Sequence, residues 1–482
     1  MPGEKRGTKH SAPSGFRWQP IILVVVLLAA SLAWPAGAEA AGWRAGVARA
    51  VITPGETLWM SGYGGRDRPA EGKLTELWAK ALVLEDPGGK KAVLVTLDLI
   101  GIDRDLSLAV RRELGRRFGF GLDGIALATS HTHTGPVVGH NLVAMYFLDA
   151  EGWARVARYA KRLRKEIPRV VGRALEGMRA ADLRWGIGRS SFAVNRRENR
   201  EADVSRLASE GKLKGPVDHD VPVLAVRASG ELVALVVGYA CHATVLSFHQ
   251  WSGDYPGFAQ MELERRHPGA VALFWAGCGA DQNPLPRRRV ELARDYGGQL
   301  ATAVDRVLAG EMHEIRGRFA AAYDEIDLPF AKLPARETLE KTAQSENRYA
   351  ARRARLLLET LRRHGKLSAT YPYPVQTWRL GPELLFVTLG GEVVVDYSLR
   401  IKKELGPTTT WVAAYTNDVM AYIPSRRVLE EGGYEGGGAM VYYGLPSVWA
   451  PEVEERIVET VRRQAARLRG RREARPERQT RR

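Results

Sequence analysis

Several features that would define other protein classes are absent from this 482-residue chain. It has no internal repeat and no clear boundary inside its main body, which favours one large domain. It has no nucleic-acid-binding motif and no basic patch interleaved with aromatic residues. Only two cysteines occur, Cys241 and Cys278, and neither closely follows the N-terminal apolar run, which argues against a lipoprotein anchor. The sequence leaves open whether they pair or are free thiols near a site.

Positive charge is abundant, but much of it lies near the end of the chain. The formal net charge is +16, and residues 467–482 contain eight arginines against Glu473 and Glu477. A basic tail can bind nucleic acid or an acidic surface, and it can also be simply solvated. We favour a solvated, disordered tail over residues 467–482 and expect no nucleic-acid partner.

The first 40 residues have the organisation of an export signal. Basic residues precede the apolar run of residues 21–34, and Ala38-Glu39-Ala40 follows as a cleavage site. The apolar run is short for a membrane span. We therefore expect a signal peptide over residues 1–40, a main domain over residues 41–466, and an exported protein that is periplasmic, secreted or at the cell surface. An uncleaved N-terminal segment is the alternative, and it provides the only membrane contact that we expect.

The apolar pattern predicts an α/β fold. Residues 92–97 and 125–128 read as strands, and residues 106–118 between them have helical spacing. This strand–helix–strand order favours mixed β-sheets flanked by helices in a single large domain, with ligands bound at strand ends.

Other segments add a hairpin and two long helices. Residues 221–226 and 232–240 read as two strands joined by a turn at a Ser-Gly pair. Residues 153–178 predict a helix that breaks at Pro168. Residues 337–363 predict one long basic helix on the surface.

Three histidines follow predicted strands. His131 and His133 come after residues 125–128, and His242 follows residues 232–240. Side chains at positions i and i+2 of an extended segment point the same way, so the first two can face one site. Neutral imidazole is the commonest protein metal ligand. Each histidine alone also fits an ordinary loop or core histidine, but the parallel between the two strand ends favours a metal site.

Oxygen-bearing side chains also follow apolar strands. Glu392 comes after residues 384–389 and a Gly-Gly pair, and Tyr422 comes after residues 411–415. These positions suit metal ligands at strand ends. Taken singly, they suit a carboxylate at a helix N-terminus and a packed aromatic side chain equally well.

Two polar segments complete the set of candidates. Asp281 and Asn283 lie beyond another apolar strand in a run of small residues, which suits either the floor of a polar site or a plain turn. The glycine-rich loop at residues 62–68 carries Arg66 and Arg68, and it either approaches a substrate or simply turns.

The order of these motifs resembles the N-terminal catalytic domain of the neutral, non-lysosomal ceramidases, which are zinc amide hydrolases. The resemblance extends over residues 43–462 and implies that zinc is held by His131, His242, Glu392 and Tyr422. It also implies that His133 faces the substrate oxygen. The matching stretches are the Gly-Tyr-Gly loop, residues 129–136, the strand that ends in His242, the Gly-Gly-Glu element and residues 417–444.

The chain departs from the family pattern at two places. Asn283 stands where the family has an active-site serine, and an amide cannot act as a nucleophile as a hydroxyl does. The residues after Arg463 are too few for the C-terminal β-sandwich domain of the family. A zinc ion with an open coordination position lowers the pKa of bound water to about 7, so water can supply the nucleophile instead of a serine.

The remaining site residues have more general expected roles. We expect His133 to donate a hydrogen bond to the developing oxyanion. Asp281 or Asp254 is expected to orient a ligand histidine or to move a proton. Arg66 and Arg68 are expected to bind an anionic part of the substrate, in a region that Asp254 also borders.

The leading hypothesis is an exported zinc-dependent hydrolase of amide or ester bonds, acting on a lipid or an N-acylated small molecule. A catalytically silent zinc- or ligand-binding protein on the same scaffold is the first alternative, and Asn283 favours it. A metallohydrolase of phosphate or sugar substrates is the second, and it rests on the basic charge alone. A long apolar slot beside the metal would favour acyl lipids, whereas a shallow polar basin would favour small soluble substrates.

Overall fold

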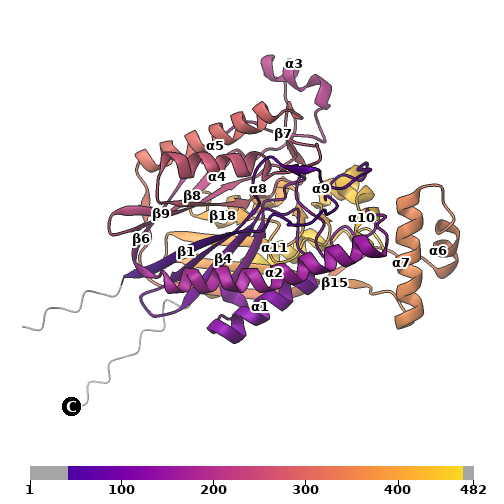
Figure 1. Cartoon of the computed structure of the whole chain (residues 1–482), viewed down its shortest axis with the longest axis horizontal. Helices are drawn as coiled ribbons and strands as arrows, with labels where there is room; N and C mark the ends of the chain where they lie inside the picture. The colour runs from indigo at the N-terminus through magenta and orange to yellow at the C-terminus, as the bar shows by residue number, and fades with distance from the viewer. Residues whose placement is uncertain (1–41, 471–482) are drawn as a thin grey trace, which may run out of the picture. The chain divides into compact units, whose positions relative to one another are not determined.

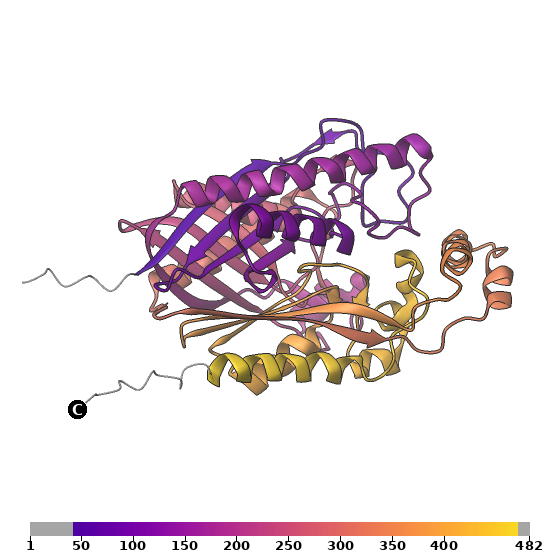
Figure 2. The same ribbon diagram turned by 90° about the horizontal axis from the view of Figure 1, so that it is seen from below.

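The computed structural model describes residues 42–470, which fold around two β-sheets packed face to face (Figure 1, Figure 2). Within these residues the main sheet has nine strands and mixes parallel with antiparallel pairs. Its strands are, in spatial order, β11 (Val271–Ala276), β9 (Glu231–Tyr239), β8 (Asp220–Ala228), β6 (Arg179–Arg189), β1 (Trp43–Val51), β3 (Trp78–Glu85), β4 (Lys91–Leu97) and β5 (Ile125–Thr129), with β13 (His313–Glu314) paired to β6.

The second sheet has four strands in the described part of the chain. Its strands β16 and β18 are parallel, and its other pairs are antiparallel. They are β14 (Phe319–Pro329), β15 (Thr370–Leu380), β16 (Leu384–Leu389) and β18 (Thr410–Ala413). Short pairs lie outside the two sheets: β2 (Gly72–Lys73) with β10 (Gln250–Trp251), β7 (Ala193–Asn195) with β12 (Gln282–Pro284), and β17 (Glu392–Val393) with β19 (Tyr422–Ile423).

Helices cover the outer faces of both sheets, which gives four layers (Figure 2). The main sheet carries α1 (Arg104–Phe118), α2 (Ala150–Glu176), α4 (Asp254–Arg266) and α5 (Val290–Ala309). The second sheet carries α8 (Val395–Leu405) and α11 (Val453–Gly470). The shorter or peripheral helices are α3 (Val204–Ser209), α6 (Arg336–Thr342), α7 (Arg348–His364), α9 (Arg426–Glu431) and α10 (Met440–Tyr443), with single turns at η1 (Leu122–Gly124), η2 (Glu201–Asp203) and η3 (Tyr434–Gly438).

This layering explains why the central strands read as unbroken apolar runs. Successive side chains of a strand point to opposite faces of the sheet. In β3, Ala81 and Val83 belong to the core beneath the helices, whereas Leu82 and Leu84 belong to the core between the two sheets. Because both faces are covered, both sets of side chains are apolar.

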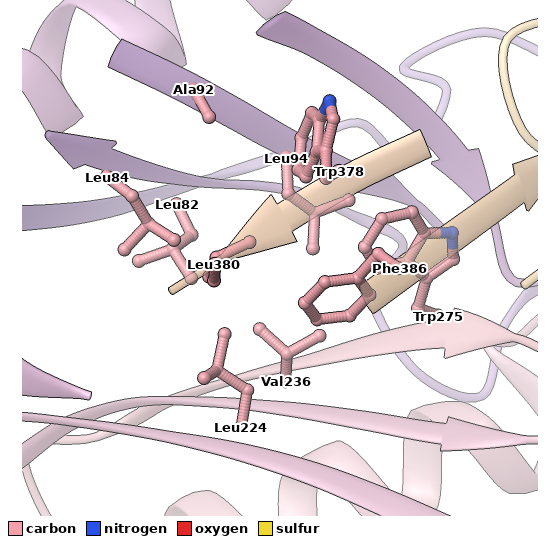
Figure 3. A pocket seen from close by; sticks show the side chains of 10 residues that line it. All are labelled: Leu82, Leu84, Ala92, Leu94, Leu224, Val236, Trp275, Trp378, Leu380 and Phe386. Carbon is pink, nitrogen blue, oxygen red and sulfur yellow. The ribbon is translucent and has the colours of Figure 1, made fainter. Parts of the chain in front are cut away.

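The core between the sheets is closely packed and apolar. Ten side chains from both sheets surround a space of only about 10 Å³, among them Leu82, Leu224, Trp275, Trp378 and Phe386 (Figure 3). The rings of Trp275 and Phe386 stack with centroids 5.4 Å apart. A space of this size and lining is part of the core and not a ligand site.

Replacing Trp275 by alanine is expected to lower the free energy of unfolding by about 3–5 kcal/mol, because the variant leaves a cavity between the two sheets. The side chain is 1% exposed, and its indole N–H donates to Thr416 Oγ1 at 2.9 Å. Urea unfolding checks the value. Trp275→Phe keeps an aromatic ring and should cost less, so equal losses for the two variants would contradict this account.

The predicted α/β organisation is confirmed. β4 and β5 are parallel neighbours, and α1 lies between them in the chain. The hairpin prediction is also confirmed, since β8 and β9 are antiparallel. Its turn residues Ser229 and Gly230 have φ angles of 52° and 81°, as a type I′ turn requires.

Two helix predictions are wrong. α2 continues through Pro168, because an apolar face that includes Leu163, Ile167 and Val171 packs against the core on both sides of the proline. Residues 337–363 form α6 and α7 and not one helix. The side chain of Asn347 accepts the first backbone N–H groups of α7 and so starts a new helix there.

The predicted signal peptide and most of the predicted tail lie outside the described residues. α11 continues to Gly470, four residues beyond residue 466, the expected end of the main domain. No helix within residues 42–470 combines the length and the apolar character that crossing a membrane requires.

Candidate metal centre

The candidate metal centre lies where strands of the two sheets end together. β5 is followed by His131 and β9 by His242, both from the main sheet, whereas Glu392 follows β16 of the second sheet. Backbone hydrogen bonds join these ends, and the N–H of Thr129 donates to the carbonyl of Tyr415 at 3.1 Å. The fold therefore brings together side chains that are far apart in the sequence.

Two histidines are oriented by backbone carbonyls. His131 Nδ1 lies 2.6 Å from the carbonyl of Ile100, and His242 Nδ1 lies 2.8 Å from the carbonyl of Gly279. A carbonyl only accepts, so each Nδ1 carries the proton. In neutral rings the Nε2 atoms are then bare acceptors, and both point into the centre. His131 adopts a φ of 58°, an uncommon conformation for a residue with a side chain.

Glu392 lies between these two rings. Its Oε2 atom is 3.1 Å from His131 Nε2 and 3.2 Å from His242 Nε2, and the carboxylate is buried. Its Oε1 atom accepts a hydrogen bond from the hydroxyl of Tyr443. The parallel pairing of β17 with β19 places Tyr422 beside Glu392, with the phenol oxygen 3.2 Å from His242 Nε2.

His133 completes a cluster of three buried histidines. His131, His133 and His242 each offer a ring nitrogen within 4.8 Å of the others, and His133 Nε2 lies 3.3 Å from His131 Nε2. Gly62 packs on the ring of His133, where a Cβ atom would lie 2.5 Å from Nδ1. The glycine of the Gly-Tyr-Gly loop is thus needed for close approach and not only for a turn.

The chemistry of this donor set fits a metal ion. Two imidazole acceptors and a carboxylate oxygen crowd together, and no described residue donates a hydrogen bond to Glu392 Oε2. Acceptors at such distances require a positive charge among them, which a proton or a cation supplies. Burial lowers the pKa of His242 to about 4 and that of His133 well below its usual value, so both rings are neutral at pH 7. Neutral imidazole and carboxylate are ligands that transition metals prefer.

An arginine that the sequence did not single out connects this centre to Asn283. One Nη atom of Arg196 donates to the Tyr422 oxygen at 3.1 Å, and the other donates to Asn283 Oδ1 at 3.2 Å. Its Nε atom donates to Glu435 at 2.7 Å. Thr244 Oγ1 also lies 3.3 Å from Asn283 Oδ1. Asn283 therefore accepts hydrogen bonds at the position where the resemblance expects a serine.

A pocket of about 440 Å³ opens beside the histidines. His133, Tyr422 and Asn283 line it, and most of the other lining residues are polar or charged. Leu285 is the sole aliphatic side chain among the described residues that line it. The others are Gly62, Tyr63, Arg196, Asn199, Arg200, Glu201, Thr244, Arg287, Tyr434 and Glu435.

Neither arginine of the glycine-rich loop lines the pocket, and their expected role in substrate binding stays a prediction. The guanidinium of Arg66 is buried and donates to the carbonyls of Phe248 and His133 at 3.0 and 2.9 Å. It therefore holds the backbone of the His-Thr-His segment. Arg68 is half exposed, pairs with Glu71 and does not line the pocket. The cations that line the pocket come from other segments.

Among the described residues, Asp254 and Asp281 form no hydrogen bond to His131, His133 or His242. Asp254 accepts the N–H groups of Leu246 and Tyr255, and so holds the chain after His242. Asp281 Oδ1 accepts the N–H of Val395 at 2.9 Å, at the start of α8. Burial raises the pKa of Asp254 to about 6 and that of Asp281 to about 7. Both carboxylates position the backbone around the centre, and the carbonyls of other residues orient the histidines.

The other residues around the centre were not predicted from the sequence. Arg196 directly follows the three-residue strand β7, and the pairing of β7 with β12 sets it beside Asn283. Tyr434 and Glu435 lie in a glycine-rich turn with no apolar period. The one available signal was the run Asn195-Arg196-Arg197 after two apolar residues, which reads equally as a surface loop. Cys241 and Cys278 are buried and free.

A buried carboxyl near the centre predicts a pH effect on stability. Burial raises the pKa of Asp418 from 3.8 to about 7, and Tyr371 donates to Oδ2 at 2.7 Å. Between these two pKa values the folded state binds more protons than the unfolded state, so the free energy of unfolding falls as pH rises. Above pH 7 the carboxyl is charged in both states, and the full cost of burying this charge remains. The cost is as much as about 4 kcal/mol.

Asp418→Asn removes this titration. We therefore compare the free energy of unfolding of the variant with that of the wild type at each pH. The difference should favour the variant more at pH 8 than at pH 5. Urea unfolding of both proteins at the two pH values measures this, and the comparison cancels the other titrating groups. A stability difference that is the same at both pH values would rule out the assigned role of Asp418.

The family model and the first curated relatives that match this chain are all neutral ceramidases or their family. Residues 43–280 match the family described as neutral/alkaline non-lysosomal ceramidase, N-terminal. The chain is similar to the neutral ceramidase A of Dictyostelium discoideum, with 25% identity over 47% of this chain and 32% of that protein. The matches span between 17% and 36% of the length of the first curated neutral ceramidases.

The fold is also similar to solved structures. A crystal structure of neutral ceramidase from Pseudomonas aeruginosa aligns with a TM-score of 0.69 and 20% identity over 89% of this chain and 75% of that chain. A structure described as ceramidase complexed with C2 aligns with a TM-score of 0.70 and 18% identity over 89% of this chain and 76% of that chain. At these identities the likeness establishes the fold.

Proposed function

Because residues 43–280 belong to the neutral/alkaline non-lysosomal ceramidase family, we propose that this protein is an exported zinc-dependent hydrolase of amide bonds. The convergence of His131 Nε2 and His242 Nε2 on Glu392 Oε2 is the single observation that carries the proposal. His131, His242, Glu392 and Tyr422 would hold the ion, and three atom pairs among them lie 3.1–3.2 Å apart. Zinc in such a site polarises a substrate carbonyl and makes water a nucleophile near neutral pH.

The side chains around the ion have separate tasks in this reaction. His133 lines the pocket and is neutral, so one ring nitrogen can carry a proton and stabilise charge that develops on the carbonyl oxygen. Arg196 holds Tyr422 and Asn283 in place through two hydrogen bonds. Because Asn283 provides no hydroxyl where the family has a serine, the proposed reaction uses water as the source of the attacking oxygen.

The pocket bears on the substrate. The solved relative named above was complexed with C2, which supports an amide of a lipid. The lining beside the histidines is nevertheless polar, with Leu285 as its one aliphatic member among the described residues. A polar basin of about 440 Å³ favours a substrate with a short acyl chain or a polar group next to the scissile amide.

Metal analysis and turnover test the proposal together. Wild-type protein should contain about one zinc per chain and should hydrolyse amides from a panel of short- and long-chain ceramides and N-acyl amino acids. Short or polar members should have the highest kcat/KM. Protein that binds no zinc would overturn the proposal, and a preference for the longest acyl chains would overturn the assignment of substrate.

A second candidate is a zinc- and ligand-binding protein without turnover. The hydrogen bonds that fix Asn283 at the serine position favour it, since they fill that position with a group that cannot attack. This candidate predicts bound zinc but no hydrolysis of any amide or ester in the panel. Zinc-dependent turnover that is lost with a chelator and restored by added zinc would exclude it.

A further inference from the structure

A large groove lies away from the metal centre, along the N-terminal half of α2. It has a volume of about 790 Å³ and is bordered by the start of α1, the loop before α2, and α7, which approaches the beginning of α2 (Figure 1). None of the residues that line it lines the metal pocket. Its size lies within the range of pockets that hold small molecules.

The groove is apolar at one end of α2 and basic further along. Trp153, Val156 and Ala160 line the first part, and Lys161, Arg164 and Lys165 line the continuation of the same helix face. These positions follow the helical spacing of i, i+3 and i+4. From Trp153 to Arg164 the helix rises about 16 Å, the scale of a long extended chain.

The cations of this groove have no acidic partner within 4 Å among the described residues, unlike the cations on the other side of α2. Arg155 and Arg158 pair with Glu151, but no ion pair forms at Lys161, Arg164 or Lys165. Other cations of α2 form ion pairs, whereas these three do not. Their unneutralised charge indicates an anion-binding site.

Arg352 of α7 adds a partly buried cation to the lining. Its Nε atom donates to the carbonyl of Val143 at 3.1 Å, and its guanidinium lies over the rings of Phe147 and Trp153. It also has no carboxylate partner within 4 Å among residues 42–470, and burial lowers its pKa. Asp103 and Asp105 line the groove as well, but Asp103 is engaged as the cap of α1.

We propose that this groove binds a single-chain anionic amphiphile of the long-chain fatty acid type. The chain lies against the apolar part of α2, and the carboxylate meets Lys161, Arg164 and Lys165. The two parts of such a molecule match the two parts of the groove, because three of its four cations follow the apolar part of α2, and only two carboxylates line the groove. This site is independent of the proposed hydrolysis.

Equilibrium dialysis of the full-length protein with labelled dodecanoate, below its micellar concentration, tests the site. Ala157 is exposed and lines the groove, so Ala157→Trp fills the groove from the surface without disturbing the core. This variant should bind dodecanoate at least about tenfold more weakly than the wild type. The triple variant K161S/R164S/K165S should also lose about tenfold, with little change for the uncharged dodecanol.

Two controls locate the binding. The triple variant R206S/K212S/K214S removes as many exposed cations from the segment around α3 and should bind dodecanoate as the wild type does. The double variant H131A/H242A disables the metal pocket and should also leave dodecanoate binding unchanged. Four outcomes would each overturn the proposal. They are loss of dodecanoate binding in H131A/H242A, equal affinity for dodecanoate and dodecanol, unchanged binding by Ala157→Trp, and association only with anionic vesicles.

Discussion

Replacing His242 by alanine is expected to abolish zinc binding at micromolar metal and to lower amide turnover to background. Loss of a group that merely orients a ligand already costs about 10–100-fold in metal affinity, so loss of a ligand itself should cost more than that. The variant also leaves Glu392 Oε2 with only one imidazole neighbour, His131. His131→Ala should behave in the same way, since the two rings stand in equivalent positions.

His219 offers a matched control for this experiment. Its ring is partly buried and bonds the carbonyl of Ala193 at 2.9 Å, away from the cluster of three histidines. His219→Ala should keep its zinc and its activity. Metal content by mass spectrometry and circular dichroism of each variant separate metal loss from unfolding. Folded His242→Ala protein that retains a full complement of zinc would contradict the assignment of this centre.

Arg196→Met is expected to lower turnover by about 10²–10³-fold, the loss typical for removal of one fixed donor from an active site. The arginine donates to Tyr422, Asn283 and Glu435 at once, and methionine keeps the length of the side chain but none of these bonds. Arg196 holds the proposed ligand Tyr422 but is not itself a ligand, so metal affinity should fall by no more than about 10–100-fold and turnover is compared at saturating zinc. The loss should therefore appear in kcat more than in metal affinity.

Arg196→Lys refines this test. Lysine keeps the charge but not the planar fork that reaches Tyr422 and Asn283 together, so activity should lie between those of the wild type and Arg196→Met. Glu435 retains its second partner, Arg197, at 2.8 Å, which limits the loss of folding stability. Arg196→Met activity within threefold of the wild type would remove Arg196 from the mechanism.

The strands that could be predicted from the sequence are those covered on both faces. β4, β5, β9 and β16 consist almost entirely of apolar residues, because helices lie on one side and the other sheet on the other. β15 was missed for the opposite reason. It begins with a half-buried, proline-containing run from Thr370, which gives no clear alternation.

Only those residues of the centre that come soon after such apolar strands could be predicted from the sequence. The structure brings His131, His242, Glu392 and Tyr422 together, and their role as ligands stays a prediction. Arg196 could not be found in this way, because a buried arginine held by a distant carboxylate looks the same in sequence as a solvated one. The contacts of Arg66 were hidden for the same reason, since its partners are backbone carbonyls.

The centre combines two histidines that follow strands of the main sheet with Glu392 and Tyr422, which form the short β17–β19 pair and follow strands of the second sheet. An ion bound there would link segments that follow strands of both sheets. The binding site is complete only after both sheets have formed and docked. The ion would therefore stabilise the fully folded protein and would give little stability to either sheet alone.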